Sequence, residues 1–163
     1  MDRPTAALNS DMEKKYALLG RVYFFAVIPF VGAVLAPWIL GPNASHVLPG
    51  FLLWSFSVLL FINASSVGYA LGKDEKWVYL HGFIALVLSA LGMACVLMSN
   101  LSATPFTAIA LLTFLHWASW LWLQKSRSFA PTFFKHHNRF VWTALACHML
   151  VLLNLIYVAR TAF

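Results

Sequence analysis

The chain has 163 residues, of which 61% are hydrophobic and only 10% are charged, and its formal net charge is +6. A water-soluble domain of this length needs more polar side chains than that to cover its surface, so the composition excludes an ordinary soluble globule and predicts a protein surrounded by lipid. The positive charge does not indicate a nucleic-acid partner, because the cations lie in short segments beside apolar runs instead of forming one basic surface with aromatic platforms.

Five apolar runs follow one another along the chain, and none of them contains Asp, Glu, Lys or Arg. They cover residues 22–40, 51–71, 77–98, 106–123 and 140–158. A helix of about 20 residues spans a hydrocarbon core about 30 Å thick, so each run is long enough to cross a membrane. Lipid cannot hydrogen-bond an open backbone, and the alternating pattern of barrel strands is absent. The sequence therefore predicts an all-α, single-domain bundle of five transmembrane helices over residues 1–163.

The distribution of basic residues predicts how this bundle is oriented. All of the 11 Lys and Arg residues except Arg160 lie before the first run, between the second and third, or between the fourth and fifth. The other two connections, residues 41–50 and 99–105, contain none. By the positive-inside rule we expect residues 1–16 to form a cytoplasmic tail and the C-terminus to be periplasmic, in a multi-pass protein of a bacterial inner membrane.

The second run carries small and polar residues at helical spacing. Asn63 and Ala64 are followed by Gly68 and Gly72, which places small side chains four residues apart on one face. Such a series lets another helix approach closely, and an intramembrane amide can hydrogen-bond across the contact. We expect these four residues to pack against a neighbouring helix.

Two histidines inside the last two runs are the main candidates for chemistry. His116 precedes Lys125 by nine residues and His148 follows Arg139 by nine, so both lie about 14 Å from the cytoplasmic edge. Equal depth does not show that the two rings face each other. Three hypotheses remain open: axial ligation of haem or a transition metal, hydrogen bonding between helices, and a proton path. The sequence leaves the cofactor unknown, with haem as one candidate.

Recognisable catalytic motifs are missing from the sequence. It has no G-x-S-x-G, no Walker lysine motif, no H-E-x-x-H and no carboxylate within a predicted span. This favours a non-enzymatic role as an accessory or interaction subunit of a membrane complex, with the bilayer and other membrane subunits as partners. The alternatives are an electron-transfer protein that binds haem or metal through His116 and His148, and a small transporter or proton path.

Short motifs also resemble a known family. They are the Ile28-Pro29-Phe30 step, the long second apolar run that ends at a glycine, and the segment 130–134 (APTFF), followed by basic residues that lead into the last run. With these features the chain is similar to the transmembrane protein 69-like family of small membrane proteins. The resemblance implies a helical membrane fold over about residues 17–158 and no particular activity.

Overall fold

The computed structural model describes residues 3–72, 78–102, 105–126 and 131–161. Within these ranges the chain forms five α-helices and one 3-10 helix. Their bounds are α1 Arg3–Leu40, η1 Gly41–Val47, α2 Leu48–Gly72, α3 Val78–Ser102, α4 Pro105–Ser126 and α5 Pro131–Thr161. All five α-helices are long and apolar enough to cross a membrane. The predicted all-helical fold with five candidate spans is therefore confirmed, while its orientation in a membrane stays a prediction.

The first helix begins much earlier than its apolar run. The sequence places the first span at 22–40 and a tail before it, whereas α1 is helical from Arg3 onward. Residues 6–8 and 12–15 are mostly strong helix formers (Ala, Leu, Met, Glu and Lys), so this polar segment continues the helix out of the apolar region. The apolar part of α1 starts at Gly20.

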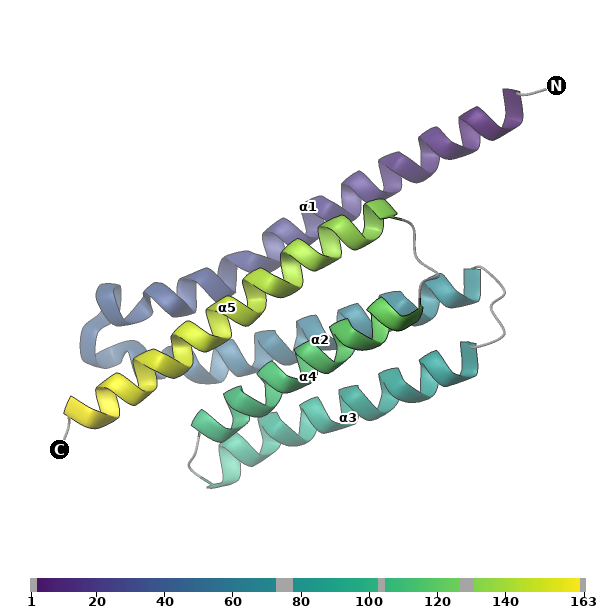
Figure 1. The fold of residues 1–163 in the computed structure, drawn as a ribbon. Helices are drawn as coiled ribbons and strands as arrows, with labels where there is room; N and C mark the ends of the chain where they lie inside the picture. The colour runs from purple at the N-terminus through teal and green to yellow at the C-terminus, as the bar shows by residue number, and fades with distance from the viewer. Residues whose placement is uncertain (1–2, 73–77, 103–104, 127–130, 162–163) are drawn as a thin grey trace.

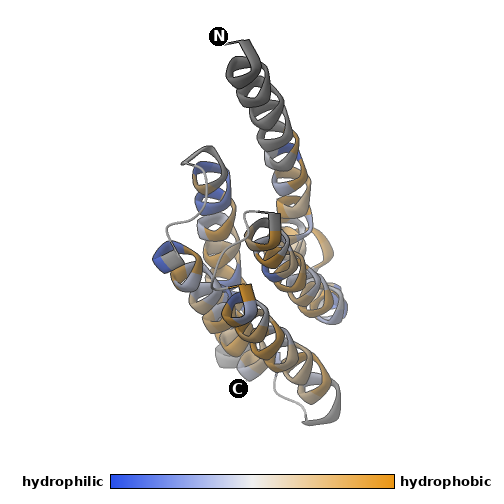
Figure 2. Ribbon diagram, turned by 90° about the vertical axis from the view of Figure 1, so that its right-hand side faces the viewer, coloured by the Kyte–Doolittle hydropathy of each residue, from blue (hydrophilic) through white to orange (hydrophobic). Residues whose placement is uncertain are grey.

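The helices follow an up-and-down order, and the two ends of the chain lie at opposite ends of the bundle (Figure 1). α4 contacts α2, α3 and α5, while α1 contacts α2 and α5. In an apolar stretch of 18 residues within each of α2, α4 and α5, 39–44% of the residues are buried. The corresponding share in α1 and α3 is 17%. The three former helices therefore form the core, and α1 and α3 flank it. Orange, hydrophobic residues dominate the middle of the helices in Figure 2.

α1 passes through Pro29 without ending. A proline at this position removes the hydrogen bond to the carbonyl of Phe25 and strains the adjacent turn. The indole Nε1 of Trp54, from α2, donates a hydrogen bond of 3.0 Å to the next carbonyl, that of Ala26. This bond links α2 to α1 one residue after the carbonyl that Pro29 leaves without its helical donor.

Two glycines lie at close contacts between helices. A Cβ added to Gly92 of α3 would lie 2.9 Å from Cδ2 of Phe56 on α2. A Cβ added to Gly20 of α1 would lie 2.8 Å from Nδ1 of His136 on α5. Both distances are shorter than van der Waals contact. The helices can come this close at these two positions only because glycine has no side chain.

The small-residue series predicted in α2 makes only part of the expected contact. Asn63 is buried; its Oδ1 accepts a hydrogen bond of 2.8 Å from Ser119 of α4. Ala64 is exposed, and a Cβ on Gly68 would meet no atom within 4 Å. The surroundings of Gly72 lie outside the described part of the structure. Ala64 and Gly68 face outward in the described chain, because α2 turns Asn63 toward α4, so their packing against a neighbouring helix stays a prediction.

Candidate functional site

The two candidate histidines meet in the centre of the bundle. His116 of α4 and His148 of α5 are 1% and 0% exposed, and their ring centroids lie 5.2 Å apart. Ser55 of α2, which is 0% exposed, lies between them. Its hydroxyl oxygen is 3.1 Å from Nε2 of His116 and 2.7 Å from Nε2 of His148. Three helices therefore converge on one polar cluster, here called the Ser55 cluster.

The backbone carbonyls around the cluster determine where the hydrogens lie. Nδ1 of His148 is 2.7 Å from the carbonyl oxygen of Ala144, and a carbonyl only accepts, so this nitrogen carries the proton. In a neutral ring Nε2 is then an acceptor, and it accepts from the Ser55 hydroxyl. Nε2 of His116 is 3.2 Å from the carbonyl oxygen of Ser55, so that nitrogen carries the proton of its ring.

This assignment produces a directed chain of hydrogen bonds. His116 donates from Nε2 to the oxygens of Ser55, the Ser55 hydroxyl donates to His148, and His148 donates from Nδ1 to Ala144. The remaining nitrogen, Nδ1 of His116, is buried and has no hydrogen-bond partner among the described residues. Buried polar atoms are nearly always paired, so this acceptor is the unusual feature of the cluster.

Aromatic rings enclose the Ser55 cluster. Phe30 of α1 lies 5.3 Å from His148 and 6.5 Å from His116 between ring centroids. Phe51 of α2 lies 4.9 Å from His148. These rings make the surroundings apolar, which strengthens each hydrogen bond and raises the cost of leaving one unmade.

A second polar pair lies further along α5. Nδ1 of His137 is 3.3 Å from the hydroxyl of Tyr23 on α1, and both residues are buried. His137 precedes His148 by 11 residues, about 16 Å along the helix. The ring of Phe140 lies between the two regions: it stacks on Tyr23 at 4.9 Å and meets Phe30 at 6.4 Å. An aromatic layer thus separates this pair from the Ser55 cluster.

Sequence reasoning missed Ser55, Tyr23 and His137. Counted from Lys73, Ser55 lies about 27 Å from the cytoplasmic edge, nearly twice the depth assigned to the histidines. Counting residues from the loops assumes that all loops on one side of the membrane lie at the same depth. The long α2 is instead displaced along its axis relative to α4. A serine within an apolar run was the feature of the sequence that could have indicated Ser55. Ser57 shows the same feature, but its hydroxyl donates to the carbonyl of Leu53 in its own helix, so the feature does not distinguish the two.

The described residues do not fit a haem held by both histidines. Metal–imidazole bonds are about 2 Å long, so two axial rings keep their centroids roughly 6 Å apart with the whole porphyrin between them. Here the centroids are 5.2 Å apart, the Ser55 hydroxyl occupies the space between the two Nε2 atoms, and Phe30 and Phe51 pack against the rings. Hydrogen bonding between helices is the hypothesis that this geometry favours.

The described residues also contain no group of three or more His, Cys, Asp or Glu side chains that could hold a metal ion. Cys95 and Cys147 are both buried free thiols. Elsewhere, polar side chains again join helices in pairs. Trp122 of α4 donates to Nδ1 of His81 on α3 at 3.1 Å, and Asn138 of α5 accepts from Trp120 and Gln124 of α4 at 2.9 and 2.8 Å.

Comparison with known proteins adds no relative to this description. No family model, no curated protein and no solved structure matches the chain. The similarity to the transmembrane protein 69-like family therefore stays a prediction from short motifs, and the five apolar helices indicate a multi-pass membrane protein.

Proposed function

We propose that this protein is an accessory or interaction subunit of a membrane complex, inserted in a bacterial inner membrane with its N-terminus in the cytoplasm. The observation that carries the proposal is the outward face of α2. Ala64 is exposed on this face, and a Cβ on Gly68, four residues later, would meet no atom of the described chain within 4 Å. Small residues at this spacing are what a second membrane helix needs in order to approach closely.

Six exposed positions of α2 follow one another at steps of three or four residues and form a stripe along the helix: Leu53, Ser57, Leu60, Ala64, Gly68 and Leu71. Trp54 and Phe61 beside this stripe are exposed as well. The hydroxyl of Ser57 is bonded to its own backbone at Leu53, so it presents little polarity to a neighbour. A transmembrane helix of another subunit fits such a stripe. The stripe is apolar at its ends, and the small residues Ala64 and Gly68 leave room for a close approach.

The polar interior supports the same role. Asn63 bonds Ser119, Ser55 bonds two histidines, and Trp122 bonds His81, each across a helix contact. Side chains used in this way hold helices in register and do not present a reacting group to a substrate. The chain then contributes a rigid shape with a contact surface on α2.

Purification in a mild detergent followed by mass spectrometry tests this proposal. We expect another membrane protein to co-purify in fixed stoichiometry, to be lost from a Gly68→Leu variant and to be retained by a Gly32→Leu variant. Gly32 is the matched control, since it is also exposed in a helix with no atom within 4 Å of an added Cβ. Recovery of the wild-type chain alone, or equal loss from both variants, contradicts the proposal.

A second candidate, a proton-accepting membrane protein, is favoured by the unpartnered Nδ1 of His116. A proton taken up there can be passed through the Ser55 hydroxyl to His148. Liposomes with a pH-sensitive dye inside test it. Wild type should dissipate an imposed pH gradient faster than His148→Phe, and equal rates contradict this candidate.

A further inference from the structure

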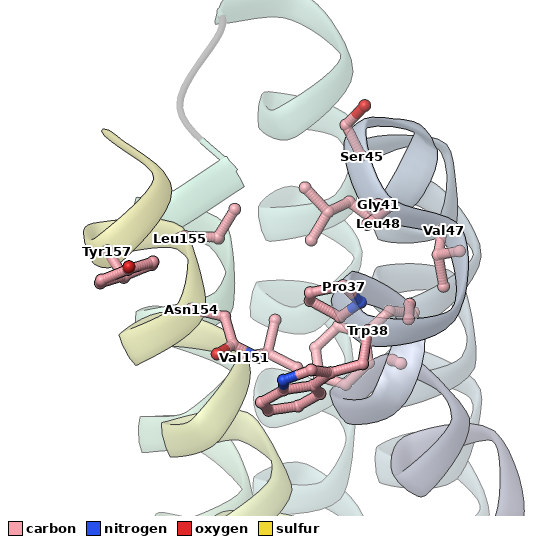
Figure 3. Close-up of a pocket in the computed structure, with 14 residues that line it drawn as sticks. Pro37, Trp38, Gly41, Ser45, Val47, Leu48, Val151, Asn154, Leu155 and Tyr157 are labelled. Carbon is pink, nitrogen blue, oxygen red and sulfur yellow. The ribbon is translucent and has the colours of Figure 1, made fainter. Parts of the chain in front are cut away.

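A pocket opens at the end of the bundle opposite the predicted cytoplasmic side. It has a volume of about 440 Å³ and lies between the end of α1, η1, the start of α2 and the end of α5. Figure 3 shows Ser45 at the η1 end of this pocket and Trp38 and Val151 at the opposite end. The candidate spans of α1 and α5 end at Leu40 and Tyr157, so in a membrane crossed by these spans the pocket would lie near the edge of the hydrocarbon core.

The walls of the pocket are mostly apolar, with a few polar groups. Ala33, Trp38 and Phe51 are among the apolar lining residues, while Ser45, Asn154 and Tyr157 supply a hydroxyl, an amide and a phenol. No Lys, Arg, Asp or Glu lines the pocket in the described part of the chain. Pockets of about 300–1,000 Å³ with apolar walls and a few fixed polar groups are typical of small-molecule sites.

Asn154 is the polar group best placed for a ligand. It is partly buried, and its Nδ2 lies 3.5 Å from the carbonyl oxygen of Val34, which is the outer limit for a hydrogen bond. No partner of its Oδ1 is found among the described residues. An amide in an apolar wall is costly unless a partner satisfies it, so a ligand with a hydroxyl group, which can donate to Oδ1, would complete the hydrogen bonding of this side chain.

We propose that the pocket binds a single-chain amphiphile with an uncharged oxygen-bearing head, such as a fatty alcohol or a monoacylglycerol. The oxygen bonds Asn154, and the hydrocarbon chain lies along Ala33 and Val151 toward Phe51. An anionic phospholipid is a poorer match, because no cation of the lining faces its phosphate. This inference goes beyond the interaction role, since the pocket lies between α1, α2 and α5, away from the stripe that contains Gly68.

Photolabelling with a diazirine-bearing hexadecanol tests the proposal on the full-length protein in detergent. Mass spectrometry should find saturable labelling of residues around 38–51 and 151–157, and unlabelled hexadecanol should compete for it. Phosphatidylglycerol should compete far less well. Labelling that does not saturate, labelling that is as strong on the exposed face of α3, or equal competition by phosphatidylglycerol overturns the proposal, because each of these results describes ordinary surrounding lipid.

Variants separate the pocket from general effects on the fold. Ala33→Phe and Ala44→Phe fill it from two different elements, and each should raise the half-saturation concentration by about tenfold. Asn154→Leu keeps the volume and removes the amide, so it should raise this concentration about fivefold. Ala94→Phe is the control, since Ala94 is exposed on α3. Circular dichroism and gel filtration identify variants that fold, and unchanged labelling in the folded pocket variants contradicts the proposal.

Discussion

The hydroxyl oxygen of Ser55 lies 2.7 Å from Nε2 of His148, and this contact joins α2 to α5. Ser55→Ala removes the hydroxyl that lies between the two histidines and leaves Nε2 of His148 without its donor in apolar surroundings. We expect the variant to lower the free energy of unfolding by about 1–2 kcal/mol. Denaturation with sodium dodecyl sulfate in mixed micelles, followed by circular dichroism, measures this change.

Ser57→Ala is the matched control for that experiment. Ser57 lies two residues away on the same helix but is exposed and bonds only the carbonyl of Leu53. Its removal should change the free energy of unfolding by less than about 0.5 kcal/mol. Equal effects of the two substitutions would mean that the Ser55 contact contributes nothing beyond a local helix effect.

The two histidines should act as a unit, because Ser55 bonds both of them. In a double-mutant cycle with His116→Ala and His148→Ala, we expect a coupling energy of about 0.5–3 kcal/mol in the free energy of unfolding. A cycle that pairs His148→Ala with His81→Ala should be close to additive, since His81 bonds Trp122 instead. Additivity in the first cycle would exclude the shared network.

The contact of α3 with α2 should depend on Gly92. An added Cβ would lie 2.9 Å from Cδ2 of Phe56 and 3.1 Å from Cδ2 of Leu59, and both side chains are buried. Gly92→Ala should therefore lower the free energy of unfolding by about 1–3 kcal/mol. Gly82→Ala, on the same helix with nothing within 4 Å, should raise it by up to about 1 kcal/mol through reduced backbone entropy. A stabilising Gly92→Ala would contradict the close approach.

The predicted orientation can be tested by chemical labelling of single engineered cysteines. Ser45→Cys in η1 should react with a membrane-impermeant maleimide added to spheroplasts, whereas Ser128→Cys should react only after the membrane is opened. The native Cys95 and Cys147 are buried and serve as an unreactive background. Reaction of both engineered positions from the same side would reject the five-span topology.

Incubation with haem tests the misfit found at the histidine pair. Because Ser55 and two phenylalanine rings occupy the space that a porphyrin requires, we expect no Soret shift that depends on His116 and His148. The wild-type spectrum should match that of a His116→Ala, His148→Ala variant. A stoichiometric Soret band that is lost in this variant would require the cluster to rearrange and would reopen the electron-transfer hypothesis.

Part of the candidate site follows from residue counts alone. The apolar runs determine the five helices, since only a helix satisfies its own backbone in lipid, and the rise of about 1.5 Å per residue places His116 and His148 at one depth. The residue count fails for α2, because it places Ser55 at a different depth from the histidines that Ser55 contacts. For the small-residue series, spacing shows which residues share a face but not where that face points.

By itself, then, the sequence determined a bundle of five helices long and apolar enough to cross a membrane, with one histidine in each of the last two, nine residues from the nearest cation of their shared loop. Only the tertiary structure decided that α4 and α5 turn these rings toward each other, that α2 brings Ser55 between them, and that Phe30 and Phe140 separate them from His137. The physical reason is that length and hydropathy specify position along a helix axis. Rotation about that axis and sliding along it depend on packing, such as the contact of Gly92 with Phe56, between residues far apart in the chain.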